Sequence, residues 1–219
     1  MKNFILFTSL TLSAALLTAQ SAQYTSAMTK AVAALDSADT PADYQATANT
    51  FSRIAQAESK EWLPLYYAAF SYLNHAFPMF KEDVAKALQT LDLAQNALDK
   101  AKTLAPGESE LAVLQAYVYI GRLMENPMTK GAEITPKVFG ALEKAAAMNP
   151  ENPRAPFLQG TYVLNMPEFY GGGAANAKAH FEKAAVLFDK ESGRGLLPHW
   201  GKKANAYYLE QVNQPGKGK

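Results

Sequence analysis

Residues 94–106, AQNALDKAKTLAP, and residues 138–150, VFGALEKAAAMNP, decide the fold of this chain. In each stretch a small or branched apolar residue is followed after four positions by leucine, after three more by alanine and after five more by proline. The first three lie on one face of a helix. The proline ends that helix because it lacks the N–H that the hydrogen-bond ladder needs. Two copies of this unit indicate an α-helical repeat protein.

A third copy and regularly placed prolines extend the pattern along the chain. Ala177, Phe181 and Ala184 repeat the spacing without the final proline. The prolines separate stretches of helical length, because each of them interrupts a helix. We therefore expect nine helices, at residues 24–38, 42–58, 60–76, 82–104, 108–124, 136–148, 153–164, 174–189 and 198–212.

The three units resemble the second helix of tetratricopeptide repeats (TPR). The helices before them resemble TPR first helices, the best of which contains Trp62, Leu65 and Tyr66. The resemblance implies an all-α fold, namely a right-handed solenoid of about four helix pairs with a C-terminal capping helix, over residues 23–212. It also implies that Trp62, Tyr119 and Gly160 pack inside the units. Replacing Gly160 by leucine should then be strongly destabilising.

Three insertions depart from a strict repeat of about 34 residues. They lie between Tyr66 and Ala94, between Ala116 and Val138, and between Gly160 and Ala177. The second contains residues 126–131, which we expect outside a helix, and the third contains Gly171-Gly172-Gly173. For these glycines we expect a tight turn, since glycine adopts positive φ without strain. An anion site at the start of the following helix is the alternative.

A second resemblance is carried by four short stretches, residues 61–64, 152–154, 169–173 and 198–201. Together they are similar to a family of exported, TPR-like proteins of Gram-negative bacteria to which no activity is assigned. The Tyr-Gly-Gly stretch and the helix after it also resemble the periplasmic helical-repeat subunit associated with TRAP transporters. That subunit is usually a lipoprotein, whereas this chain has no cysteine.

The first 22 residues are typical of a secretory signal peptide. Lys2 is followed by an apolar stretch from Phe4 to Leu17 and then by small residues that suit cleavage. Without cysteine the chain forms no disulfide and carries no lipid anchor. We expect a periplasmic or secreted protein that is not a lipoprotein, with no transmembrane segment after cleavage. A flexible tail is expected at residues 213–219.

Charge and motif content argue against several functions. The formal net charge of +1 is not that of a nucleic-acid binder. The three histidines have no metal-binding spacing, so we predict no metal site and no cofactor. Neighbouring carboxylates such as Glu108 and Glu110 are interpreted as solvated. The segment around Ser192 is interpreted as a linker, and we find no catalytic constellation. The chain is therefore expected not to be an enzyme.

The TPR resemblance also implies which side chains line a concave binding face. Tyrosine and arginine there suit recognition, because each joins apolar area to a hydrogen-bond donor. The alternative is that Tyr67 and Tyr117 are buried in a superhelix too short to have an open groove. Trp200 is expected to cap the last repeat. The predicted face consists of Tyr67, Phe70, Ser71, Tyr117, Ile120, Arg154, Phe157 and Thr161.

Two functions fit such a face. The first is a scaffold that binds a protein or peptide in the concave groove, an expectation that rests largely on fold analogy. The alternative is a small-molecule binder beside an envelope transporter, with its solute near Tyr67, Tyr117 and Arg154. A deep closed cavity favours the solute, and an open channel favours the peptide.

Overall fold

The computed structural model describes residues 22–214, and every regular element in this range is helical. The all-α prediction is therefore confirmed. The predicted signal peptide, apart from Ala22, lies outside the described residues, and so do residues 215–219 of the predicted tail. No helix within residues 22–214 is both long and apolar enough to cross a bilayer.

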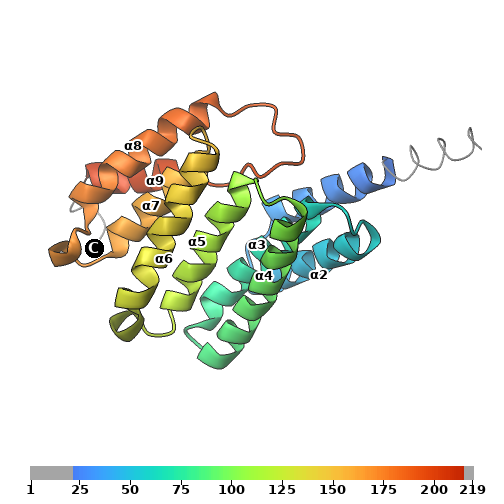
Figure 1. Ribbon diagram of the computed structural model, residues 1–219, viewed down its shortest axis with the longest axis horizontal. Coiled ribbons are helices and arrows are strands. Elements are labelled where there is room, and N and C mark those ends of the chain that lie inside the picture. Colours follow the sequence, from blue (N-terminus) through green and yellow to red (C-terminus); the bar gives the residue numbers. More distant parts are fainter. Residues whose placement is uncertain (1–21, 215–219) are drawn as a thin grey trace, which may run out of the picture.

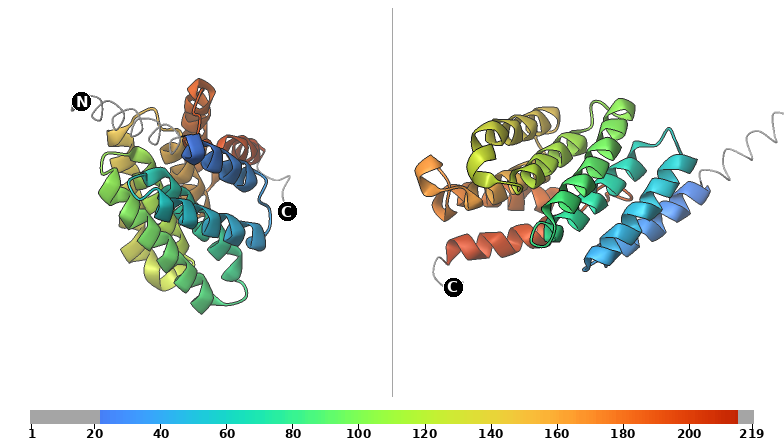
Figure 2. Two further views of the ribbon diagram at one scale, coloured as in Figure 1. Left: turned by 90° about the vertical axis from the view of Figure 1, so that its right-hand side faces the viewer. Right: turned by 90° about the horizontal axis from the view of Figure 1, so that it is seen from below.

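The helices form four consecutive pairs followed by one further helix (Figure 1). From α2 to α9 each helix packs against its neighbour in the chain, and α3, α5 and α7 also contact one another in that order. In the right view of Figure 2, α9 and the N-terminal helices lie on one side of the molecule, and α6 lies on the opposite side. The helices are residues 22–36, α2 Pro41–Ala57, α3 Trp62–Met79, α4 Val84–Leu104, α5 Ser109–Leu123, α6 Pro127–Met148, α7 Arg154–Asn165, α8 Ala174–Lys190 and α9 Lys202–Asn213, with the short 3-10 helix η1 Glu168–Tyr170 between α7 and α8.

The apolar stripes of the repeated units are buried as predicted. All nine of their residues are at most 2% exposed, because each stripe faces the preceding helix of its own pair. Small residues in these stripes let the helices approach closely. The nine are Ala94, Leu98, Ala101, Val138, Leu142, Ala145, Ala177, Phe181 and Ala184.

Helix α6 begins nine residues before its predicted start. The side chain of Asn126 accepts a hydrogen bond of 3.1 Å from the Thr129 N–H and so caps the helix. Pro127 occupies the first turn, where its missing N–H has no partner to lose. Pro136, the predicted start, lies inside the helix. The prediction that residues 126–131 form a non-helical insertion was therefore wrong, since most of them belong to α6.

The predicted last helix is shorter than expected. It begins at Lys202 instead of residue 198, and residues 191–201 run from α8 to α9 without helical structure. We call residues 191–201 the strap. In Figure 1 the strap reaches from the end of α8 toward the N-terminal helix before it turns back to α9.

Two apolar clusters form the core, and they meet at α5. One contains the N-terminal helices and reaches Leu111, Leu114 and Val118, whereas the other begins at Ala112 and extends through α9. Tyr117 packs against both clusters. The layer of α3, α5 and α7 therefore joins the two halves and positions the strap that crosses it.

Candidate functional site

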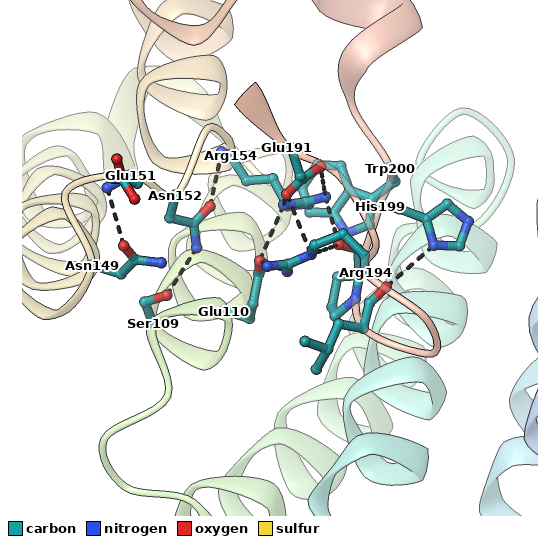
Figure 3. Close-up of polar contacts among 12 residues, drawn as sticks. Ser109, Glu110, Asn149, Glu151, Asn152, Arg154, Glu191, Arg194, His199 and Trp200 are labelled. Carbon is teal, nitrogen blue, oxygen red and sulfur yellow. Dashed lines mark hydrogen bonds and ion pairs between the residues drawn. The ribbon is translucent and has the colours of Figure 1, made fainter. Parts of the chain in front are cut away.

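The strap is attached to the helices by the side chain of Arg154 (Figure 3). Arg154 is the first residue of α7 and is completely buried. Its guanidinium donates to both carboxylate oxygens of Glu191, at 2.7 and 2.9 Å, and to the Pro198 carbonyl at 2.6 Å. It also donates to Glu110 Oε1 in α5 at 3.1 Å. One side chain thus joins both ends of the strap to two helices.

A second arginine closes this ion cluster from the strap itself. Arg194 donates to Glu110 Oε1 at 2.7 Å and to the Pro198 carbonyl at 3.0 Å. Burial alone would lower the pKa of Arg154, but the carboxylates of Glu110 and Glu191 raise it above the ordinary arginine value. Arg154 therefore stays charged inside the protein, which makes its two carboxylate partners necessary.

Glu110 is buried, contrary to the prediction that it lies on a solvated helix face. It is 3% exposed, and its Oε2 has no hydrogen-bond partner among the described residues. Burial raises the pKa of Glu110, and the nearby charges of Arg154 and Arg194 only partly oppose this rise. The carboxylate is covered because the strap lies over the start of α5, and the sequence near Glu110 gives no sign of this.

Three further contacts fix the path of the strap. Tyr67 donates its hydroxyl to the Leu196 carbonyl at 2.8 Å. The indole Nε1 of Trp200 donates to the Tyr66 hydroxyl at 2.7 Å. His199 Nε2 lies 3.1 Å from both carboxylate oxygens of Asp36 in the N-terminal helix. The strap therefore contacts the first, second, third and fourth helix pairs.

Trp200 completes an aromatic surface on α3 and α5. Its ring stacks on Phe70 at 5.0 Å between centroids and on Tyr117 at 6.0 Å, and Phe77 lies 5.1 Å from Tyr117. All four side chains are only partly buried. We call Phe70, Phe77, Tyr117 and Trp200 the aromatic face.

Two tyrosines from more distant helices belong to the surroundings of this face. Burial is the main cause that raises the pKa of Tyr117, and the nearby Tyr208 of α9 and Tyr44 of α2 raise it further. Tyr44 and Tyr208 are themselves partly exposed. The aromatic face is therefore uncharged at neutral pH and bordered by hydroxyl groups.

Five of the eight predicted binding residues meet at the strap. Phe70, Tyr117 and Phe157 surround Trp200, with Phe157 in an edge contact at 6.2 Å. Tyr67 and Arg154 hold the strap. The alternative prediction, that Tyr67 and Tyr117 are buried, therefore holds for Tyr67. Tyr117 is partly exposed to solvent.

The other three predicted residues are less involved. Ser71 is fully buried and accepts a hydrogen bond of 3.2 Å from the Thr47 hydroxyl of α2, so it faces that helix. Ile120 and Thr161 are partly exposed, one helical turn beyond Tyr117 and Phe157 respectively. Direct contact of any of the eight residues with a ligand stays a prediction.

The strap, and the roles of Glu110, Glu191 and Arg194 beside it, were not predicted from the sequence. Trp200 was interpreted only as a cap, and Glu191 and Arg194 as parts of a linker. Glycine and charge in residues 191–195 are typical of linkers, and no periodicity marks an extended segment that is buried. The signal that was present is the Pro-His-Trp-Gly stretch at residues 198–201, since a tryptophan flanked by helix breakers needs a partner surface.

Two other features of the described chain are weaker candidates for a site. The loop of the strap borders a solvent-open depression of about 420 Å³, and its lining includes Arg194, His199 and Lys202 but none of the eight predicted residues. These three side chains already contact Glu110, Asp36 and Asp189 respectively. Among residues 22–214 no group of three potential metal-ligating side chains occurs. The aromatic face is therefore the better candidate.

The fold and this face together define an all-α protein in which α3 and α5 carry aromatic rings that stack on Trp200 of its own strap. No protein-family model matches the chain, and no curated protein matches its sequence. Among solved structures the chain is similar to the HusA haemophore from Porphyromonas gingivalis, with a TM-score of 0.78 and 31% sequence identity. The match covers 90% of this chain and 96% of HusA. The chain therefore belongs to the same family as this haemophore.

Proposed function

We propose that this protein is an exported binder of haem or a related porphyrin, and that the macrocycle stacks on the aromatic face. The similarity to a haemophore over nearly its whole length supports the ligand class. The observation that carries the site is the stacked arrangement of Phe70, Trp200 and Tyr117, all partly exposed. Aromatic rings of this kind offer a flat apolar surface to a flat ligand.

The chemistry of the face favours contact with the porphyrin ring over coordination of its iron. A tyrosine ligates haem iron as the phenolate, whereas burial raises the pKa of Tyr117 and disfavours that form. His199 is engaged with Asp36, and His75 Nδ1 lies 2.8 Å from the Pro41 carbonyl. We therefore expect metal-free protoporphyrin to bind within about tenfold of haem.

The small-molecule reading replaces the peptide scaffold as the leading function. A peptide in the predicted groove would have to displace the strap. That would break the contacts of Arg154 with Glu191 and Pro198 and the contact of Tyr67 with Leu196. A planar ligand that stacks on the exposed part of the aromatic face leaves these contacts in place.

A titration tests the proposal. Haem is added to the purified protein, and the change of its Soret absorption gives the affinity. We expect Tyr117→Ala and Trp200→Ala each to weaken binding by about tenfold or more, which corresponds to about 1.4 kcal/mol for one lost stacking partner. Far-ultraviolet circular dichroism establishes that each variant keeps its helices.

The matched control is Phe169→Ala/Tyr170→Ala. These two aromatic side chains are the most exposed in the described chain, at 79% and 71%, and they lie outside the aromatic face. If haem adsorbed unspecifically to exposed aromatic side chains, this control should adsorb the least haem. If the control loses affinity while Tyr117→Ala keeps it, the aromatic face is not the site. A wild-type protein that leaves the Soret band unchanged excludes the function.

A further inference from the structure

One edge of the molecule carries an unusual concentration of exposed apolar side chains. The turns between α3 and α4, α5 and α6, and α7 and α8 follow one another along the lower left edge of Figure 1. They hold half of the large apolar residues that are exposed in the described chain. We call these five residues the turn edge: Val84 (40% exposed), Met124 (40%), Met128 (94%), Phe169 (79%) and Tyr170 (71%).

The most exposed pair, Phe169 and Tyr170, is held by a well-defined turn. Gly171 and Gly173 have φ values of +84° and +91°. A Cβ at Gly172 would stand 2.0 Å from the Met166 carbonyl oxygen, and the Gly173 N–H donates to the Val163 carbonyl at 3.0 Å. The three glycines therefore form the predicted tight turn. Its result is that two aromatic rings project from the protein in a fixed position.

The turn edge is too small and too divided for a stable protein interface. Its five side chains together offer roughly 650 Å² at most. A stable interface needs about 800 Å² from each partner in matching shape. Projecting tips on three separate turns do not make such a surface. A bilayer accepts apolar and aromatic tips one by one, because the interfacial region adapts to them.

The charges beside the turn edge indicate which lipid surface fits. Near α4 the ammonium of Lys86 pairs with Asp83, and near α6 that of Lys130 pairs with Glu125. The third turn, between α7 and α8, carries the exposed carboxylate of Glu168. None of the three turns therefore presents the basic cluster that anionic lipids attract. We propose that the turn edge docks the protein on a zwitterionic phospholipid surface, with Met128, Phe169 and Tyr170 inserted among the headgroups.

Co-sedimentation with phosphatidylcholine vesicles tests this proposal. The protein is purified from the periplasm of the producing cells, so that the predicted signal peptide does not contribute. We compare the wild type with Met128→Ser/Phe169→Ser/Tyr170→Ser. The control is Leu93→Ser/Val186→Ser/Tyr207→Ser, which removes three apolar residues that are 49%, 58% and 58% exposed on other surfaces. We expect the turn-edge variant to lose at least tenfold in vesicle binding and the control to match the wild type.

Three outcomes overturn the proposal. The wild type does not sediment with the vesicles, or the control loses as much binding as the turn-edge variant. In the third, analytical ultracentrifugation shows a dimer that only the turn-edge variant abolishes, which would assign this edge to a second copy of the chain. The proposal is independent of haem binding, since the measurement uses ligand-free protein.

Discussion

Gly160 shows how much a single residue contributes to the packing of a helix pair. A Cβ at residue 160 of α7 would stand 2.8 Å from the ring of Phe181 in α8. The TPR resemblance implied this close contact correctly, because the motif requires a small residue where two helices cross. Residue size at a crossing is a local property, and so the sequence is sufficient to predict it.

We expect Gly160→Leu to lower the free energy of unfolding by about 3 kcal/mol, because the larger side chain overpacks the crossing. Urea denaturation followed by circular dichroism measures the change. Gly140→Leu is the control, since Gly140 is exposed in α6 and nothing lies within 4 Å of its Cβ position. There leucine should stabilise the helix slightly. Equal midpoints for the two variants would show that the crossing is not tightly packed.

The pH dependence of stability should reveal the burial of Glu110. Its pKa is raised above the ordinary value of 4.5, so its contribution to stability is largest below that value and is lost as the pH rises through the folded-state pKa. The quantity of interest is the unfolding free energy of the wild type minus that of Glu110→Gln. We therefore expect this difference to decrease as the pH rises from below 4.5 to neutrality. Denaturation series at several pH values measure it.

The control for this series is Glu182→Gln, which removes an exposed carboxylate that lies beside Lys178. If this difference instead increases with rising pH, the attraction of the two arginines for the Glu110 carboxylate outweighs the effect of its burial. The sequence could not predict this residue's environment. Its burial depends on Arg154, 44 positions away, and on Arg194, 84 positions away.

At the scale of elements, the sequence predicts those that depend on local signals and not the one that depends on long-range contacts. The helix pairs were predictable because apolar spacing and prolines act within a few residues. The early start of α6 was missed, although Asn126 and Pro127 are a recognisable capping sequence. The strap was missed because it has no regular structure and is held by contacts to residues as distant as Asp36.

Arg154 should decide whether the strap stays attached. Arg154→Met keeps apolar volume but leaves Glu110 and Glu191 with Arg194 alone as an arginine partner. Breaking a buried ion pair costs about 3–5 kcal/mol. We expect trypsin to cleave after Arg194 at least tenfold faster than in the wild type. Timed digestion with mass spectrometry measures the rate, and Arg53→Met serves as a surface control. An unchanged rate would mean that the contacts of Tyr67, Arg194, His199 and Trp200 hold the strap without Arg154.

At the scale of the whole molecule, α5 should be the most stable element. Its side chains belong to both apolar clusters, whereas the helix at residues 22–36 and α9 each pack at one end of the stack. Amide exchange follows the free energy of local opening. We expect hydrogen–deuterium exchange to be slowest in α5 and at least tenfold faster in the two terminal helices. Protection of α9 equal to that of α5 would contradict this arrangement.

The strap also limits how this architecture can change during evolution. Open helical-repeat proteins gain and lose whole repeats, because each repeat contacts only its neighbours. Here one segment of fixed length contacts Asp36 in the first pair and Arg154 in the fourth. Inserting or deleting a pair would move one of these anchors out of reach. The strap therefore selects against changes in the number of helix pairs.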